Sequence, residues 1–267
     1  MKDIPLGFVN SQIIQRIDWA DHLFSLRVQA PLSAFPSPPY ISGQFSKLGA
    51  MNEEGEWVRR AYSMVNKPCI KGADFQEKTI ELEFLVIEVL EGNLTPLLGH
   101  KQVGDDVIVG ILPAGFMTID EVPEPAKDLW MLSTGTGIGP YLALLEEIEQ
   151  CERFEHLILV HAVRTKAELV YKDKIIELMK QHKGKLRYVP IVSREDVSGA
   201  LSGRIPERLK DGSLEKAAHV DLHPTDSFFY LCGNPNMIHD TRDTLQQMGY
   251  KKHLRRETGQ FSFENYW

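Results

Sequence analysis

The chain is poor in cysteine and contains no long hydrophobic run. Its three cysteines, Cys69, Cys151 and Cys232, are odd in number and far apart. This excludes a disulfide framework, a CxxC redox pair and a four-cysteine iron–sulfur site within the chain. No apolar run approaches the roughly 18–20 residues of a membrane-spanning helix, and the first residues lack the apolar core of a secretory signal. We therefore expect a protein of the reducing cytoplasm with no membrane partner.

Positive charge is also not in excess. Lys and Arg number 30 against 37 Asp and Glu, a net charge of −7, which argues against a sequence-wide nucleic-acid binder. The 43% hydrophobic content is enough for a real core. Because domains typically contain roughly 100–200 residues, the 267 residues suggest two domains.

The first half has no long amphipathic helix before about residue 140. Residues 24–28 alternate between apolar and polar with period two, and residues 81–90 and 107–112 are rich in β-formers. Prolines and glycines break the stretches between them into loops. This pattern predicts a small antiparallel β-barrel.

The second half alternates strands with helices. Apolar runs at 129–133, 157–163, 186–192 and 228–232 are separated by helical patterns at 140–148, 167–180 and 237–248. Such alternation predicts a parallel sheet in an α/β domain. A proline-bearing stretch at 121–126 separates the halves, so we predict domains at 1–125 and 126–267.

A glycine-rich turn lies where the first of these parallel strands meets its helix. The segment Thr134-Gly135-Thr136-Gly137-Ile138-Gly139-Pro140 lets a ligand approach the backbone and offers free N–H groups at a helix start. It is not a strict GxGxxG, and it lacks the lysine of a phosphate-binding P-loop. A tight turn without a ligand remains an alternative.

Basic residues follow the next strands. Arg164 stands after Val163, where an acidic residue would hold a ribose 2′-hydroxyl and an arginine suits a 2′-phosphate. Arg194, after Ser193, and Arg204 fall near later turns and are expected to converge on the same group. Each arginine alone could equally be a solvated surface residue.

Four further segments carry aromatic or polar patterns. Arg60-Ala61-Tyr62-Ser63 offers a cation, an aromatic ring and a hydroxyl, and Tyr266-Trp267 places two aromatics at the chain end. The other two are Gly92-Asn93-Leu94-Thr95-Pro96 and Tyr230-Leu231-Cys232-Gly233-Asn234-Pro235. Terminal aromatics need a flat surface to cover, either a neighbouring chain or a cofactor.

Taken in order, these segments resemble the ferredoxin–NADP reductase family, in particular its bacterial-type ferredoxin/flavodoxin–NADP reductases. Arg60–Ser63 is similar to the RxYS flavin motif, and 92–96 to the segment that contacts the flavin pyrophosphate. The glycine turn and the CGNP sequence at 232–235 resemble the nicotinamide side, and Glu264-Asn265-Tyr266 resembles the E-x-Y of the C-terminus. Trp267 departs from plant-type members, which end at the tyrosine.

The resemblance implies hydride exchange between NADPH and the N5 atom of FAD, and electron transfer to or from ferredoxin or flavodoxin. It implies catalytic roles for four residues: Ser63, Cys232, Glu264 and Tyr266. The FAD contacts that it implies are Arg60, Ala61, Tyr62, Ser63, Leu85, Asn93, Leu94, Thr95, Thr136, Tyr266 and Trp267. The NADP contacts are Val163, Arg164, Ser193, Arg194, Arg204, Tyr230, Cys232, Gly233 and Asn234. Tyr266 would cover the flavin ring, and Trp267 would extend toward the adenosine.

Several alternatives stay open. The same architecture could serve an NADPH–flavin reductase or an oxygenase-linked reductase, and a non-catalytic NADP-binding sensor is a second class. His219 and His223 could be read as a metal pair, but no third ligand is evident, so we expect no metal. The basic run at 251–256 is a solvated face or a docking site for an acidic redox partner. We expect a monomer.

Overall fold

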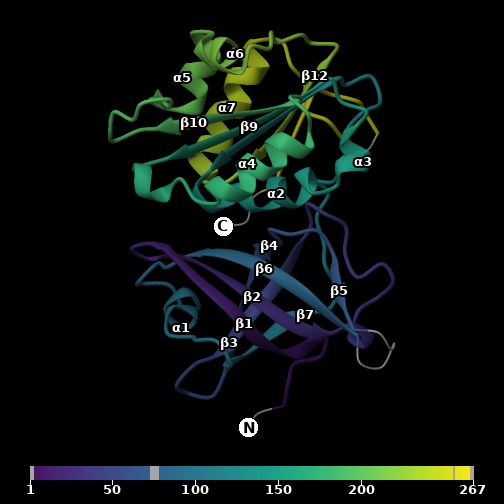
Figure 1. Ribbon diagram of the computed structural model, residues 1–267, viewed down its shortest axis with the longest axis vertical. Helices are drawn as coiled ribbons and strands as arrows, with labels where there is room; N and C mark the ends of the chain where they lie inside the picture. The colour runs from purple at the N-terminus through teal and green to yellow at the C-terminus, as the bar shows by residue number, and fades with distance from the viewer. Residues whose placement is uncertain (1–2, 73–77, 255, 265–267) are drawn as a thin grey trace. The chain divides into compact units, whose positions relative to one another are not determined.

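The computed structural model describes residues 3–72, 78–254 and 256–264. The chain divides into two compact units, Met1–Thr118 and Ile119–Trp267. Each unit contains one sheet (Figure 1).

The first unit is an antiparallel barrel. Its elements, in chain order, are β1 (Phe8–Ala20), β2 (Leu23–Pro31), η1 (Leu32–Ala34), β3 (Phe45–Met51), β4 (Trp57–Ser63), β5 (Cys69–Lys71), β6 (Thr79–Ile87), α1 (Thr95–Gly99) and β7 (Asp106–Gly110). The strand order is β4-β3-β7-β1-β2-β6-β5. Directly after β4, Met64 bridges Phe84, and the Val65 N–H donates to Glu83 O at 2.8 Å. These contacts join β4 to β6 and close the sheet.

Apolar side chains at every second strand position fill the interior of the barrel. Leu82, Phe84 and Val86 of β6 point into the core with Leu26 and Val28 of β2, as the period of two requires. The predicted barrel and its parallel α/β partner are both observed, so the predicted fold class is confirmed.

The short helix α1 is anchored at both ends. Leu94 and Leu98 are buried in the barrel core. The Arg16 guanidinium donates to Leu98 O at 3.3 Å and to Lys101 O at 2.9 Å, and it lies 4.1 Å from the centre of the Phe24 ring. A cation at the carboxyl end of a helix satisfies carbonyls that lack partners within it.

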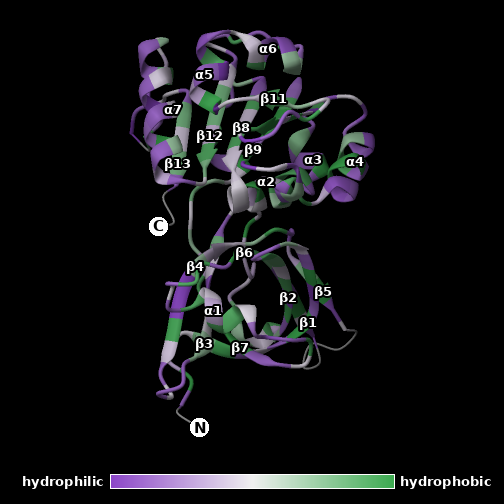
Figure 2. Cartoon of the chain, turned by 90° about the vertical axis from the view of Figure 1, so that its left-hand side faces the viewer, coloured by the Kyte–Doolittle hydropathy of each residue, from purple (hydrophilic) through white to green (hydrophobic). Residues whose placement is uncertain are grey.

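The second unit is a parallel sheet with helices on both faces. Its strands are β8 (Asp128–Thr134), β9 (His156–Val163), β10 (Leu186–Val192), β11 (Leu201–Ser202), β12 (Ser227–Cys232) and β13 (Phe261–Glu264). Its helices and 3-10 turns are η2 (Ile119–Glu121), η3 (Gly135–Ile138), α2 (Gly139–Leu145), α3 (Ile148–Cys151), η4 (Lys166–Glu168), α4 (Lys172–Gln181), α5 (Ile205–Lys210), α6 (Ser213–Ala218) and α7 (Pro235–Gln247). Helices α5 and α7 lie on one side of the sheet and α2, α3 and α4 on the other (Figure 2).

The strand order of the second unit is β11-β10-β9-β8-β12-β13, and all its strands are parallel. The side on which successive strands are added changes between β8 and β12. From β8 the chain moves outward through β9, β10 and β11, and then returns to the other side of β8 for β12 and β13. Ligands of open α/β sheets bind outside the carboxyl ends of the strands at such a switch point. The fold therefore points to the ends of β8 and β12.

The stretch predicted as a linker packs within the second unit, so the unit begins seven residues before the predicted boundary. The Arg153 guanidinium donates to Val122 O at 2.8 Å and to Ile119 O at 3.3 Å. These bonds hold the stretch against the unit that contains Arg153. The partners in these bonds are about 30 positions apart in the chain, so no local sequence pattern predicts them.

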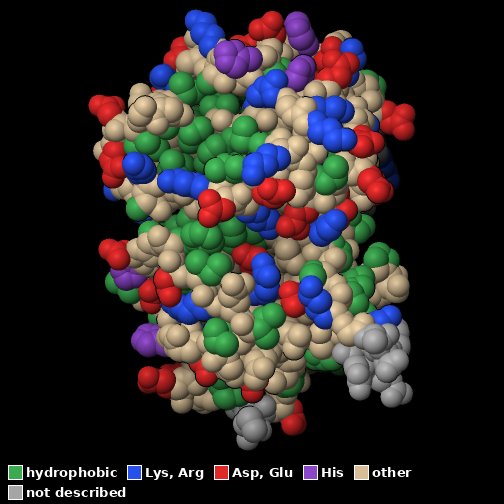
Figure 3. Space-filling model, viewed as in Figure 1, with side chains coloured by type: hydrophobic (Ala, Val, Ile, Leu, Met, Phe, Trp, Pro, Cys, Tyr) green, Lys and Arg blue, Asp and Glu red, His purple; other side chains and the backbone are tan. Residues whose placement is uncertain are grey.

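The surface of the second unit carries charges of both signs. On the visible face of the second unit, Lys and Arg side chains are interspersed with Asp and Glu (Figure 3). No helix among the described residues is long and apolar enough to cross a membrane.

Candidate functional site

Strand β4 carries the first predicted segment. Arg60 and Tyr62 share one face of the strand because they are two residues apart; Ala61 and Ser63 occupy the other face. Arg60 is exposed, whereas Tyr62 is half-buried and meets Phe84 edge-on, with ring centroids 6.4 Å apart. Burial raises the pKa of Tyr62 to about 12. The strand thus offers an exposed cation beside a neutral aromatic ring that packs against Phe84.

The second predicted segment forms the turn into α1. Thr95 Oγ1 accepts the Val89 N–H at 2.9 Å and donates to Val89 O at 3.0 Å. A Cβ at Gly92 would lie 2.9 Å from both Thr95 Oγ1 and Val89 O, so this turn requires glycine. The Thr95 proton is therefore engaged within the turn. Asn93 is exposed and Leu94 is buried. The amides that begin α1 have no partner inside the helix.

Leu85 lies on β6 opposite the residues that fill the barrel. Its neighbours Phe84 and Val86 point into the core, so the Leu85 side chain faces the other way, where it is nevertheless buried.

At the switch point, the backbones of two strand ends touch. A Cβ at Gly137 would lie 2.5 Å from Cys232 O, and a Cβ at Gly233 would lie 2.7 Å from Thr134 O. Gly233 also has a φ of 134°. The Asn234 N–H donates to Thr134 Oγ1 at 2.8 Å. Glycine at both positions is what allows the turn after β8 and the end of β12 to pack together.

A row of polar side chains crosses the sheet beneath this contact. Strand register aligns Glu264 of β13 with Cys232 of β12, Cys232 with Ser133 of β8, and Ser133 with His161 of β9. Paired residues of neighbouring strands share a face, so these four side chains form one line, called here the polar row. Cys232 and His161 are both fully buried.

Cys232 is a neutral thiol. Burial raises the pKa of Cys232 far above its usual value, and the nearby Glu264 carboxylate raises it further. A buried thiol held in its protonated form does not act as a nucleophile at neutral pH. Its position beside the glycine turn suits packing against a ligand, with Thr136 half-exposed in the same turn.

Two of the three predicted arginines, Arg164 and Arg194, lie together at the carboxyl ends of β9 and β10. The ladder of these strands continues past their ends, because the Ser193 N–H donates to Val163 O at 3.0 Å and the Arg194 N–H donates to Arg164 O at 2.9 Å. Arg164 and Arg194 are therefore neighbours, and both are exposed. Exposed Arg204 stands immediately before α5, where its N–H donates to Glu207.

Glu168 is a residue of this cluster that the sequence analysis missed. Its carboxylate accepts bonds from Arg164 Nε and Nη2, both at 2.9 Å. It also accepts the Arg164 backbone N–H at 3.0 Å. The i, i+4 spacing of arginine and glutamate was the available signal. This clamp fixes the direction of the guanidinium.

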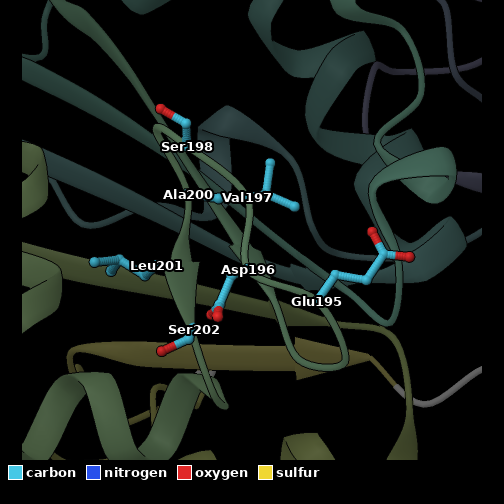
Figure 4. A pocket seen from close by; sticks show the side chains of 7 residues that line it. All are labelled: Glu195, Asp196, Val197, Ser198, Ala200, Leu201 and Ser202. Carbon is cyan, nitrogen blue, oxygen red and sulfur yellow. The ribbon is translucent and has the colours of Figure 1, made fainter.

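A pocket of about 320 Å³ lies directly after Arg194, in the connection from β10 to β11. It is lined by one continuous segment: Glu195, Asp196, Val197, Ser198, Ala200, Leu201 and Ser202. Asp196 and Ser202 lie near each other, whereas Glu195 extends away from them (Figure 4). The Glu195 carboxylate accepts the Lys166 N–H at 3.1 Å. The pocket is thus an open concavity at the carboxyl edge of the sheet.

Two predicted NADP contacts have structural roles here. Tyr230 is fully buried and meets Phe228 edge-on at 5.2 Å. Burial raises the pKa of Tyr230 well above its usual value. The Asn234 side chain caps α7 by accepting the Asn236 N–H at 2.9 Å.

Tyr266 and Trp267 lie outside the described residues. No three His, Cys, Asp or Glu side chains within 3–72, 78–254 and 256–264 gather as a metal site requires.

The residues present fit two cofactors. In the first unit, exposed Arg60 beside the ring of Tyr62 suits a group that combines phosphates with a flat ring system. In the second unit, a glycine-lined switch point and the exposed, neighbouring Arg164 and Arg194 at strand ends suit a phosphorylated dinucleotide. Both groups match the chemistry predicted from the sequence.

Comparison with known proteins gives the same answer. Residues 131–243 match the family described as an oxidoreductase NAD-binding domain. The flavodoxin/ferredoxin–NADP reductase of Buchnera aphidicola subsp. Baizongia pistaciae is 40% identical over 261 residues, covering 97% of this chain and 99% of that protein. The Escherichia coli K12 protein of the same name is 42% identical over 235 residues, 88% of each chain.

A solved structure agrees over the full length. The crystal structure of a ferredoxin NADP+ reductase from Neisseria gonorrhoeae, with bound FAD and NADP, has a TM-score of 0.86 and 34% identity, covering 98% of this chain and 100% of that one. The resemblance predicted from five motifs in order is confirmed. The chain belongs to the flavodoxin/ferredoxin–NADP reductase family.

Proposed function

We propose that this protein is an FAD-dependent reductase that passes electrons between NADPH and a small one-electron carrier, ferredoxin or flavodoxin. The observation that carries the proposal is the switch point, where the glycine turn after β8 packs against Cys232 at the end of β12, and Cys232 is paired with Glu264 of β13. Bound FAD supplies the redox chemistry, since a flavin takes an electron pair as hydride and releases electrons singly.

The first unit binds the flavin. Tyr62 supports the ring system with an aromatic face that is already fixed against Phe84. Ser63 offers a hydroxyl to the ring edge. Arg60 and Thr95 hold the pyrophosphate, Thr95 through its backbone N–H, since its hydroxyl shapes the turn through bonds to Val89. The remaining flavin contacts of this unit are Leu85, Asn93 and Leu94.

The second unit binds the dinucleotide. Arg164, Arg194 and Arg204 form charge-assisted bonds to the 2′-phosphate, and Glu168 holds Arg164 in place beforehand. Thr136 and the neutral Cys232 thiol frame the nicotinamide. Glu264 supplies negative charge beside them. The protein's contribution to the hydride step is orientation of this ring in a site shielded from water.

The chain end and the partner extend the proposal. Tyr266 covers the flavin until nicotinamide displaces it, and Trp267 continues toward the adenosine. The basic run at 251–256 docks an acidic carrier protein. One lysine of this run, Lys252, places its Nζ 4.3 Å from the centre of the Phe263 ring. Phe263 is the residue immediately before Glu264, so this lysine lies close in the chain fold to the proposed site. The protein acts as a monomer in the cytoplasm, and gel filtration tests the monomer.

Two measurements on purified protein test this function. The first denatures the protein and identifies the released flavin by chromatography, and FAD is expected. The second follows NADPH-driven reduction of cytochrome c with and without added ferredoxin or flavodoxin. Carrier-dependent turnover supports the proposal, whereas release of FMN alone, or turnover indifferent to both carriers, contradicts it.

A further inference from the structure

His161 is a buried titratable residue to which the proposed mechanism gives no task. It is fully buried in β9, and its Nε2 lies 3.0 Å from Gly135 O. Because a carbonyl oxygen only accepts, the ring proton sits on Nε2. Within the part of the chain that the structure describes, Nδ1 has no hydrogen-bond partner.

An imidazole is a costly choice for this position. A buried acceptor without a partner destabilises the folded state, and an apolar side chain would avoid that cost. Burial also lowers the pKa of His161 to about 4, so the ring is neutral at neutral pH. The imidazole makes one hydrogen bond that an apolar side chain could not make, from Nε2 to Gly135 O.

That bond determines how one peptide of the glycine turn is oriented. Gly135 has a φ of 53°, a conformation that glycine adopts readily. In a planar trans peptide the carbonyl and the following N–H point in opposite directions. With Gly135 O directed at His161, the Thr136 N–H is directed away from β9.

The opposite side of the same turn rests on Cys232. Gly137 packs so closely on Cys232 O that a Cβ there would lie only 2.5 Å away. His161 and Cys232 belong to the same polar row, separated by Ser133, and neighbouring strands lie about 4.8 Å apart. The turn is therefore held at two points by one line of residues.

We propose that His161 is a positioning residue: its Nε2–H holds the Gly135–Thr136 peptide in the orientation that presents the turn to the nicotinamide half of NADP(H). This inference rests on the proposed function. It gives the neutral imidazole of the polar row a defined purpose beside those proposed for Glu264 and Cys232.

Two substitutions separate the hydrogen bond from packing. His161→Gln places an amide nitrogen at the position of Nε2 and keeps the bond to Gly135 O. His161→Asn is equally polar but shorter, so its amide does not reach. The matched control is His182→Asn, since buried His182 donates in the same way to Leu145 O at 2.8 Å, at the far end of α2.

The first readout is the rate of flavin reduction at saturating NADPH, measured by stopped flow. We expect His161→Gln within twofold of the unsubstituted protein and His161→Asn slower by about tenfold, or ~1.4 kcal/mol in the barrier. His182→Asn should keep the full rate, and the affinity for 2′,5′-ADP should not change in any variant. An unchanged rate in His161→Asn, or equal losses in Asn and Gln, overturns the proposal.

The second readout does not depend on turnover. In nitrogen-15 NMR spectra, we expect a proton on Nε2 of His161 and a Thr136 amide signal that moves when NADP+ is added. That movement should persist in His161→Gln and shrink in His161→Asn. A Thr136 signal that ignores NADP+ while the nucleotide binds overturns the inference and leaves the proposed reductase intact. Absence of FAD from the purified protein contradicts the reductase instead.

Discussion

Cys232 and Glu264 stand directly opposite each other on neighbouring parallel strands, in the last registered pair of β12 and β13. The carboxylate adds to burial in raising the pKa of the thiol. The pair thus places a neutral sulfur and an acidic group at the switch point of the sheet. A buried, protonated thiol is unsuited to nucleophilic chemistry, and ligand contact is the role proposed for Cys232.

Cys232→Ala should slow hydride transfer from NADPH without releasing FAD. The expected loss is about tenfold or more, because the ring of the nicotinamide would lose its lateral support. Stopped-flow reduction of the flavin measures it. Cys151→Ala is the matched control: Cys151 is also a buried thiol, but its Sγ lies 3.5 Å from Leu144 O, away from the switch point. Equal rates in the two variants would remove Cys232 from the site.

Arg164→Ala should weaken the use of NADPH and leave NADH unaffected. A hydrogen bond to a charged group contributes roughly 1.5–3 kcal/mol, so kcat/KM for NADPH should fall about ten- to hundredfold. Steady-state kinetics with both nucleotides give the ratio. Arg187→Ala, near the amino end of β10, serves as the control and should change neither value. A parallel loss for NADH would mean that Arg164 does not read the 2′-phosphate.

The stability of the protein should fall in acid partly because of His161. Its pKa is about 4 in the folded protein and 6.5 in the unfolded chain. The unfolded chain therefore binds the extra proton between these values, and stability is full above pH 6.5 and lost as the pH falls toward 4. The full effect is about 3 kcal/mol.

Urea unfolding at pH 7 and pH 4.5 measures this loss. His161→Gln has no titratable group at this position, so its stability should depend less steeply on pH in that range. His182, whose pKa burial also lowers, is present in both proteins and cancels in the difference. Identical pH profiles for the two proteins would show that His161 is not buried as described.

Tyr266→Ser tests the proposed role of the chain end. An aromatic stack contributes only about 0.5–1.5 kcal/mol beyond area burial, so nicotinamide should displace Tyr266 during turnover. The variant should bind nicotinamide more tightly and discriminate less between NADP and NAD. Removal of Tyr266 and Trp267 together should also loosen FAD. Titration of the charge-transfer band and flavin release check both effects; if neither changes, the tail is a plain surface end.

The fold was predictable wherever periodicity is local. The period-two run at 24–28 became part of β2, and the apolar run at 157–163 became most of β9. The predicted helix at 140–148 instead stops at Leu145 and resumes as α3. Strand β13 was not predicted: its residues Phe261-Ser262-Phe263-Glu264 do alternate between apolar and polar, but four residues are a short pattern, and the strand depends on pairing with β12.

The site was predictable only where a motif carries it. The glycine turn and the arginines follow strand ends, so their place at the edge of the sheet could be expected. The bond from His161 to Gly135 could not, because His161 lies inside an apolar run and its partner depends on how the turn folds. The clamp of Glu168 on Arg164 was visible as a spacing, although its function was not.

Anaerobic addition of NADPH to the purified protein, followed by visible absorption, tests the central claim most directly. The account predicts the visible absorption of a bound oxidised flavin, which bleaches with one equivalent of NADPH and far more slowly with NADH. A protein without flavin, or a flavin that NADPH leaves oxidised, would contradict it.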